Sequence, residues 1–351
     1  MAADKTTLQQ TRRVHWVDFL KGIAIILVVL GHCDLPTFLI NTVYLFHMPL
    51  FFMISGYLDN SHKERSLRAV VKKKAPRLLW PYLTYGVIVI LWKTLTGYGQ
   101  QGNFTTLLLK RITAFVYGNY IWENNYNYIG TLWFLVGLFC VICISWLHHR
   151  IRSEKARLVI AAAVALCGAL FSKLLLQWNV RLPWCLDVAL VAILFYELGL
   201  WYRQRKKSAD GKALLAGSLL LVAGFGVGVC NVYVAGSTRI GMLPLTFGSV
   251  PLFLVGAVLI CLGFMIVAGC LYGRIRLKLI EYAGRQSLTI MIAHLYILSV
   301  LVAIGNRIVP GVSPWIYFLL TTVLSVLAAF IVDKYLPFLN DFRYAKKSKC
   351  K

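Results

Sequence analysis

Acidic side chains are scarce in this chain of 351 residues, which has 13 Asp and Glu against 37 Lys and Arg. Charged residues of both signs make up only 14% of the sequence, whereas 59% of it is hydrophobic. Soluble domains contain about 45–50% apolar and about 25% charged residues, so the composition excludes an ordinary soluble protein. Long apolar runs recur along the chain, and we expect an integral membrane protein.

Other features are missing as well. No internal repeat and no polar segment large enough to fold alone is visible. The N-terminal residues lack a signal-peptide cleavage pattern, so the first apolar run is expected to remain as a membrane span. Cys140 and Cys143 form a C-x-x-C within an apolar run, without a second such pair. The sequence therefore predicts no metal site, and small apolar filling explains these cysteines better.

Stretches of roughly 20 mostly apolar residues predict an all-α membrane protein with ten transmembrane helices in one domain, residues 1–351. The eighth apolar stretch is long enough to tilt or break. The predicted spans lie near 14–33, 39–58, 77–97, 128–147, 157–175, 184–202, 213–234, 242–272, 286–304 and 314–335.

The formal charge of +24 has an uneven distribution along these spans. With the N-terminus placed inside, 28 of the 37 Lys and Arg fall in inner segments and six in outer loops. Cytoplasmic loops of membrane proteins carry an excess of Lys and Arg. We therefore expect both termini in the cytoplasm. The positive charge then reports membrane topology, and nucleic-acid binding is not expected.

The first span, "DFLKGIAIILVVLGH", carries three ionisable residues, Asp18, Lys21 and His32. Eleven residues of helix turn about 1100° and rise about 16 Å, so Lys21 and His32 share one face. Ionisable groups inside a membrane usually serve function or pair with another polar group. This polar face predicts a passage through the bundle, although Asp18 could instead bind Lys21 in a structural salt bridge.

The second span, "YLFHMPLFFMISGYL", contains His47 near its outer end and Ser55-Gly56 near its inner end. His47 suits either a structural or a functional role, and Ser-Gly pairs also permit close helix packing. The basic run Lys72 to Lys74 with Arg77 follows, before Trp80 and Pro81. It suits anchoring to anionic lipid, or docking of a phosphorylated cytoplasmic ligand.

Later segments add further polar and aromatic candidates. The outer loop 98–127 contains Trp122 and Tyr126 among several asparagines, which suits contact with a sugar as well as an interfacial aromatic belt. Asp187 in the sixth span and His294 in the ninth are further intramembrane ionisable residues. Proton-coupled transport could explain these residues, as could catalysis.

The order of these motifs resembles the acyltransferase 3 family of membrane enzymes, in particular its fucose 4-O-acetylase-like branch. The likeness covers almost the entire chain. A lysine replaces the first arginine of the family's R-x-x-R pattern at Lys74-x-x-Arg77, which keeps the charge but weakens bidentate binding. The matching motifs are Lys21-x10-His32, "FHMPLFFMISGY" at 46–57, "LWFL" at 132–135, "PWCLD" at 183–187 and "GRQSLTIMIAH" at 284–294.

The resemblance implies transfer of an acyl group, usually acetyl, from a cytoplasmic coenzyme A thioester to a hydroxyl of a cell-surface or lipid-linked glycan. It also implies a bacterial inner membrane, with acetyl-CoA as a co-substrate and no tightly bound cofactor. The bilayer, the acyl-CoA donor and the glycan acceptor are the expected partners. The implied catalytic residues are His32 and Lys21, the implied donor-binding residues are Lys73, Lys74, Arg77 and Ser55, and the implied supporting or acceptor residues are Asp18, His47, Trp122, Tyr126, Trp133, Asp187 and His294.

Two mechanisms are open for His32. A neutral imidazole could remove the proton of the acceptor hydroxyl, or it could carry the acyl group transiently. A different function class is a multispan transporter or flippase for a glycolipid or polysaccharide, which would use the same polar residues as a substrate path. Acceptor-dependent consumption of an acyl thioester distinguishes the enzyme from the transporter.

Overall fold

The computed structural model describes residues 14–97, 103–119, 130–205, 210–236, 238–272, 276–308 and 311–342. Within these ranges the secondary structure is helical, and the β-type pairing is a single isolated bridge between Gly241 and Thr246. The short 3-10 turns are η1 (Ser61–Lys63), η2 (Gly130–Leu132), η3 (Pro183–Cys185) and η4 (Pro337–Leu339). The α-helices are α1 (His15–His32), α2 (Thr37–Tyr44), α3 (His47–Leu58), α4 (Leu67–Gly97), α5 (Phe104–Tyr117), α6 (Trp133–His148), α7 (Glu154–Gln177), α8 (Leu186–Arg205), α9 (Gly211–Ala235), α10 (Val250–Leu271), α11 (Lys278–Arg285), α12 (Ser287–Ile308) and α13 (Pro314–Tyr335).

The prediction of an all-α membrane protein with ten spans is confirmed. Ten helical segments of the described chain are long and apolar enough to cross a bilayer. Their burial differs greatly. In an 18-residue apolar window of each segment, 83% of the residues of Gly130–His148 are buried inside the protein, against 17% for Gly211–Ala235 and 17% for Pro314–Tyr335. Apolar side chains that the protein itself does not cover are left to face lipid, as expected for outer helices of a membrane bundle.

The second predicted span, near 39–58, falls within the apolar segment Thr37–Lys63, but it consists of two helices, α2 and α3, with a break at 45–46. Pro49 explains the break. Its ring would clash with the carbonyl group four residues earlier in a continuous helix, and it lacks a donor N–H. Pro49 instead occupies the first turn of α3, where neither defect matters. The break places His47 at the start of a helix.

Two other helix boundaries differ from the prediction, and one predicted loop contains a helix. Helix α4 begins at Leu67 rather than near 77, so its polar first turns precede the apolar part. Helix α10 begins at Val250 rather than near 242, because the chain turns with positive φ at Leu245 and at Gly248. The predicted outer loop 98–127 contains the helix α5, which Asn103 caps by accepting a hydrogen bond from the Thr106 N–H at 2.8 Å.

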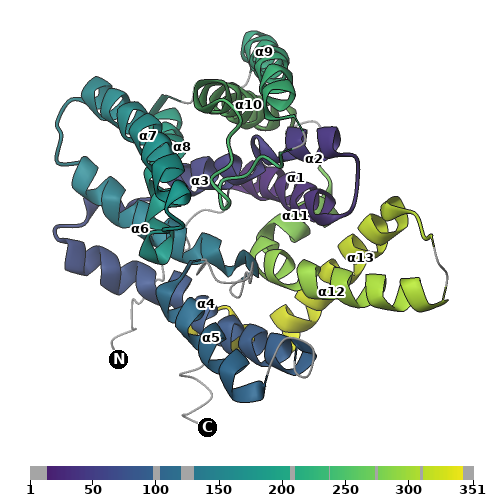
Figure 1. The fold of residues 1–351 in the computed structure, drawn as a ribbon. Helices are drawn as coiled ribbons and strands as arrows, with labels where there is room; N and C mark the ends of the chain where they lie inside the picture. Colours follow the sequence, from purple (N-terminus) through teal and green to yellow (C-terminus); the bar gives the residue numbers. More distant parts are fainter. Residues whose placement is uncertain are drawn as a thin grey trace, which may run out of the picture.

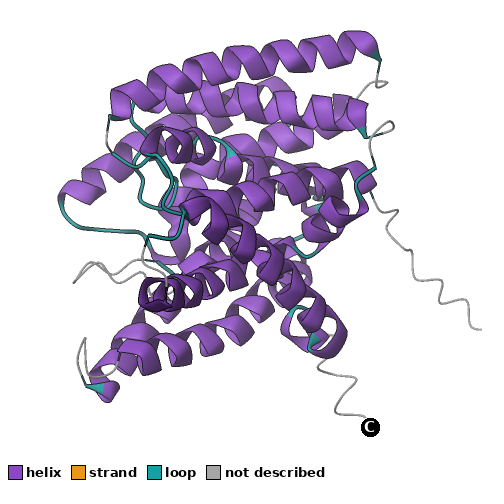
Figure 2. Ribbon diagram, turned by 90° about the vertical axis from the view of Figure 1, so that its right-hand side faces the viewer, coloured by secondary structure: helices purple, strands orange, loops and turns teal. Residues whose placement is uncertain are grey.

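Helices α1, α2 and α3 lie at the centre of the view in Figure 1, with the α9–α10 pair on one side and the α12–α13 pair on another. Helices α6, α7 and α8 cover a third side, and Figure 2 shows how nearly all of the described chain is helical. Small residues allow the closest of these contacts. A Cβ atom at Gly56 of α3 would lie 2.0 Å from the Tyr196 carbonyl oxygen of α8, so only glycine fits there.

Helix α11 packs equally tightly against the first half of α1. A Cβ atom at Gly22 would lie 2.0 Å from the Ile280 carbonyl oxygen, and one at Gly284 would meet the Asp18 backbone. These glycines let the two backbones touch. The arrangement fixes the first half of α1, at the level of Lys21.

Candidate active site

A cavity of about 510 Å³ lies at the C-terminal end of α1. Its walls are formed by the break between α2 and α3, the start of α6, the loop between α9 and α10, and one side of α12. The described residues that line it are Val28, His32, Tyr44, His47, Met48, Gly130, Thr131, Trp133, Thr238, Arg239, Gly241, Met242, Leu243, Pro244, Thr246, Met291 and Leu295.

The half-buried His32 side chain has a defined tautomer. Its Nδ1 lies 2.8 Å from the Val28 carbonyl oxygen one turn earlier in α1. A carbonyl oxygen only accepts hydrogen bonds, so Nδ1 carries the proton in the neutral ring. The lone pair is therefore on Nε2, the nitrogen that a base or a nucleophile would use.

Tyr44 contacts this nitrogen, and Arg239 in turn contacts Tyr44. The Tyr44 hydroxyl lies 3.4 Å from His32 Nε2, and because that nitrogen has no proton, the hydroxyl is the donor. Arg239 donates from Nη2 to the Tyr44 hydroxyl at 2.9 Å and to the Gly31 carbonyl. Its guanidinium also stacks over the Tyr44 ring, 4.6 Å from the centroid. Arg239, Tyr44 and His32 thus form one connected set.

His47 and His294 repeat the arrangement of His32. The Nδ1 of His47 lies 2.9 Å from the Val43 carbonyl oxygen, and that of His294 lies 3.0 Å from the Ile290 carbonyl oxygen. Both rings are buried. The His294 ring packs edge-on against His32 with centroids 4.8 Å apart, and the His47 ring packs edge-on against Tyr44 at 4.6 Å. Two further imidazoles thus adjoin this set, His294 beside His32 and His47 beside Tyr44.

The loop that carries Arg239 is fixed by two buried asparagines. Asn41 donates to the Thr238 carbonyl at 3.1 Å and accepts from the Ile240 N–H at 2.9 Å. Asn231 donates to the Phe247 carbonyl at 2.9 Å and accepts from the Ser249 N–H at 2.8 Å. Each amide side chain satisfies two backbone groups, as a neighbouring strand would, and the loop is held at both ends.

The structure brings together several of the sequence-predicted residues. His32, His47 and Trp133 line the cavity, and His294 contacts His32 from behind. Lys21 and Asp18 lie near the other end of α1, where α11 packs. Trp122 and Tyr126 lie outside the described residues.

The predicted donor-binding residues lie away from the cavity, and two of them have acidic partners. Lys74 pairs with Asp59 in a largely buried contact, and Lys73 pairs with Glu64 at 2.6 Å. The Ser55 hydroxyl donates to the Phe51 carbonyl of its own helix at 2.7 Å. These contacts give all three side chains a local role.

Arg77 differs from the two lysines. Its side chain is exposed and forms no salt bridge with any described residue. Of the basic residues predicted to bind the donor, it therefore keeps its full fork of donors for a ligand.

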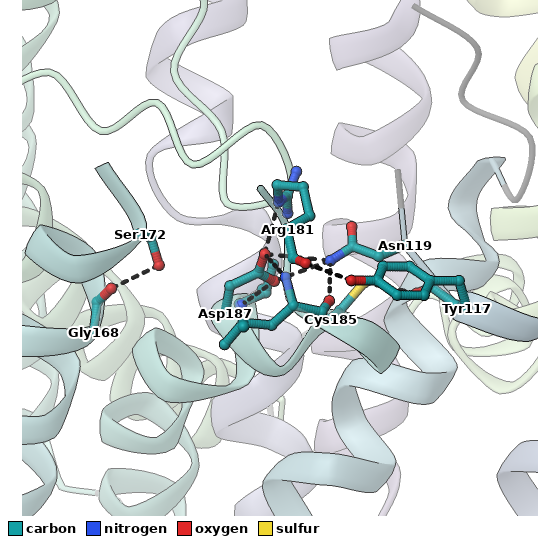
Figure 3. Close-up of polar contacts among 10 residues, drawn as sticks. Tyr117, Asn119, Gly168, Ser172, Arg181, Cys185 and Asp187 are labelled. Carbon is teal, nitrogen blue, oxygen red and sulfur yellow. Dashed lines mark hydrogen bonds and ion pairs between the residues drawn. The ribbon is translucent and has the colours of Figure 1, made fainter. Parts of the chain in front are cut away.

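Asp187 does not line the cavity but joins a separate buried network, shown in Figure 3. Arg181 donates from Nε to its carboxylate at 2.6 Å, and Asn119 donates to it at 3.2 Å. The Tyr117 hydroxyl donates to the Arg181 carbonyl at 2.6 Å. Burial, with the Asp187 charge, raises the pKa of Tyr117, which keeps this donor protonated. The network ties the end of α5 to the start of α8.

Among the cavity residues that sequence reasoning missed, Tyr44 and Arg239 are the two connected to His32. Tyr44 stood within the quoted second-span motif, and Arg239 was counted only among the outer basic residues. The scarcity of basic residues in the outer loops was the available signal for Arg239, because a basic residue there runs against the usual bias. Among the described residues no group of three or more His, Cys, Asp or Glu is arranged to hold a metal ion.

Comparisons with known proteins add a family-level likeness. A family model described as an acyltransferase domain matches residues 14–334. The nodulation protein NolL of Mesorhizobium japonicum is 31% identical over 170 residues, which cover 43% of this chain and 40% of the relative. The nodulation protein NolL of Sinorhizobium fredii is 34% identical over 130 residues, which cover 34% of this chain and 32% of the relative. The chain thus spans less than half the length of these curated relatives, and no solved structure gives a significant match.

Proposed function

This chain belongs to the acyltransferase 3 family of membrane proteins, and from that premise we propose that it is an O-acyltransferase acting on a glycan. The acyl group, acetyl in the simplest case, comes from acyl-CoA on the cytoplasmic side. It is transferred to a hydroxyl of a cell-surface or lipid-linked glycan. The likeness to two bacterial proteins favours a bacterial inner membrane as the location.

The observation that carries this proposal is the orientation of His32 at the cavity. Its Nδ1–H is bound to the Val28 carbonyl, so the basic lone pair is on Nε2, beside a space of about 510 Å³. The acceptor hydroxyl would replace the long 3.4 Å hydrogen bond that Tyr44 donates to this nitrogen. A sugar hydroxyl is a weak nucleophile and needs such a base. The same lone pair would also make the ring a nucleophile in its own right.

In the general-base mechanism, the hydroxyl oxygen attacks the thioester carbonyl carbon while His32 Nε2 accepts the hydroxyl proton. The resulting tetrahedral intermediate breaks its carbon–sulfur bond, and the thiolate of coenzyme A takes the proton from the imidazolium. The products are the O-acyl glycan and free coenzyme A, and His32 returns to its neutral form. The Val28 carbonyl holds the ring in place throughout, because its hydrogen bond to Nδ1 persists in both protonation states.

In the acyl-carrier mechanism, His32 Nε2 attacks the thioester carbonyl first and the thiolate leaves. The acylated imidazole then gives its acyl group to the glycan hydroxyl, whose proton passes to a second base. His294 is placed for this, since its ring lies 4.8 Å from that of His32 and its Nε2 bonds to no described residue.

The predicted topology separates the two substrates. The end of α1, the start of α3 and the loop between α9 and α10 all lie at outer ends of their spans. The cavity they form therefore belongs to the acceptor side. Lys21 lies about 16 Å further along α1, toward the cytoplasmic side, where the acyl arm of the donor would enter. Arg77 is the candidate for binding the phosphates of coenzyme A, because its charge lacks a salt-bridge partner among the described residues.

Purified protein in detergent, a labelled acetyl thioester and candidate glycans provide the test. Release of free coenzyme A that depends on the acceptor, together with label in the glycan, supports the proposal. A transporter or flippase would bind the glycan without consuming thioester, and that result would reject it.

A further inference from the structure

Arg239 is an unusual residue for its position. In the predicted topology it lies in an outer loop, where only six of the 37 basic residues are found, and among those six it alone lines the described cavity. Arg181 is neutralised by Asp187 at 2.6 Å, whereas no Asp or Glu is among the described residues that line the cavity. The guanidinium therefore brings a positive charge to the cavity without a carboxylate to balance it.

Holding the loop in place does not require this charge. Asn41 and Asn231 already fix the loop through four backbone hydrogen bonds, on either side of the bridge between Gly241 and Thr246. Arg239 uses only Nη2 for its bonds to Gly31 and Tyr44. Its Nη1 and Nε donate to no described residue, and the side chain is exposed at the cavity. Two donor nitrogens of the planar guanidinium, Nη1 and Nε, are thus available to a ligand.

The distance from this charge to the reacting nitrogen matches the size of a sugar. The contacts from Arg239 to the Tyr44 hydroxyl, 2.9 Å, and from that hydroxyl to His32 Nε2, 3.4 Å, keep Nη2 within about 6 Å of the base. A hydroxyl at hydrogen-bond distance from Nε2 and an anionic group at hydrogen-bond distance from Arg239 then belong to one sugar ring or to adjacent groups. Arginine binds planar carboxylate and phosphate groups through paired hydrogen bonds.

We propose that the cavity selects an acidic acceptor, with Arg239 binding a carboxylate or phosphate group that lies close to the acylated hydroxyl. This inference rests on the proposed acyl transfer and specifies the substrate class of the same cavity. Tyr44 is a positioning residue in this arrangement, because it supports the guanidinium by stacking and contacts His32 Nε2 through its hydroxyl. The anionic group can belong to an acidic sugar or to the phosphate that joins a glycan to its lipid.

The first experiment identifies the acceptor by its charge. Membranes of cells that encode the chain, with the gene deleted and restored, are incubated with radiolabelled acetyl-CoA, and labelled glycan is separated on an anion exchanger. We expect the label to be retained. Methyl esterification neutralises carboxylates, so the treated glycan should no longer bind the anion exchanger if its charge is a sugar acid. Mild acid should have the same effect if the charge is a lipid-linking phosphate. Label that is never retained overturns this inference, whereas no gene-dependent label in glycan rejects the proposed function instead.

The second experiment links the charge to Arg239. Acceptor isolated from the deletion membranes, native or charge-neutralised, is offered to purified wild type, Arg239→Ala, Arg239→Lys and the control Arg307→Ala, whose exposed side chain does not line the cavity. Neutralising the acceptor should raise KM roughly 10- to 100-fold for wild type and Arg307→Ala, but less than about threefold for Arg239→Ala. Arg239→Lys should lie between them.

Two results would overturn the inference while leaving acyl transfer established. Neutralisation of the acceptor could raise KM equally in wild type and Arg239→Ala, which would remove Arg239 from anion binding. Alternatively, Arg239→Ala could lower kcat for native and neutralised acceptors alike with KM unchanged. That second result would place the guanidinium on the tetrahedral intermediate rather than on the acceptor.

Discussion

Replacing His32 by alanine separates catalysis from folding more sharply than any other change in this chain. His32 is the last residue of α1 and is only half-buried. Its main polar contact is the 2.8 Å hydrogen bond to the Val28 carbonyl, a group within the α1 backbone ladder. Removal of such a bond costs about 0.5–1.5 kcal/mol. The free energy of unfolding should therefore fall by about 1 kcal/mol.

The effect on turnover should be several times larger. General-base contributions are typically about 10²–10⁴-fold, which corresponds to about 2.7–5.4 kcal/mol at 1.36 kcal/mol per decade. A nucleophilic role would add to this loss, because the covalent route would disappear. Donor affinity should stay unchanged, since the donor phosphates are expected at the opposite end of α1.

The matched controls are His47→Ala and His294→Ala. Both rings are buried and bind backbone carbonyls as His32 does, so both variants should lose at least as much stability as His32→Ala. In the general-base mechanism their loss of turnover at equal folded protein should be smaller, because only His32, on the Lys21 face of α1, accepts the hydroxyl proton. A loss for His294→Ala as large as that for His32→Ala would instead favour the acyl-carrier mechanism. The assay measures labelled acetyl transferred to glycan in detergent, with thermal unfolding followed in parallel. Wild type incubated with donor alone, then rapidly denatured and desalted near neutral pH, should carry label that His32→Ala lacks only if His32 carries the acyl group.

Near-normal turnover by His32→Ala, with folded protein held constant, would refute the reasoning. A drop in turnover that merely follows the loss of folded protein would refute it as well. Rescue of the variant by added imidazole provides a positive control, because it restores the missing base without restoring the side chain.

Four further predictions follow from the described contacts. Arg77→Ala should weaken coenzyme A binding by about 1.5–3 kcal/mol, as for a charged hydrogen bond, and unchanged affinity in a titration would assign Arg77 to lipid anchoring. Lys74→Ala should instead destabilise the protein by about 1–3 kcal/mol, visible in thermal unfolding, because its buried carboxylate partner loses its counter-charge; a stable variant with weakened donor binding would contradict this. Gly56→Ala should reduce stability by at least about 1–3 kcal/mol, because a Cβ would lie 2.0 Å from the α8 backbone, and a well-folded variant would disprove that contact. A cysteine at Asn125, in a chain without other reactive cysteines, should react with an impermeant reagent in intact cells, and labelling only after lysis would disprove the predicted topology.

The family and the class of fold were readable from the sequence. Apolar runs of the length of a bilayer dictate helices, because a backbone in lipid must satisfy its own hydrogen bonds. The predicted spans match the observed segments to within a few residues at most ends. The main differences lie at 77–97, where α4 starts earlier, and at 242–272, where α10 starts later. Within 39–58 the span divides into two helices shortly before Pro49.

Part of the site was also within reach of the sequence. His32 and Lys21 share a helix face, and that relation depends only on the helical repeat. His47 was expected near His32 because a short connection joins the first two spans. Trp133 came only from the resemblance to a family.

Tertiary structure alone decided the rest. His294 comes from a helix more than 250 residues after His32 in the chain, and no local periodicity predicts which helices of a bundle become neighbours. Arg239 lies in a loop whose course depends on side-chain bonds from Asn231, at the end of the preceding helix α9, and from Asn41 of α2, which is distant in the chain. Asp187 and Lys74 were candidate site residues in the sequence, and the structure places an opposite charge beside each of them. The sequence by itself thus determined the helices and the face of α1, because these depend on residues close together in the chain. The cavity, its charge and the pairing of ionisable groups depend on contacts between distant segments, which only the packed fold defines.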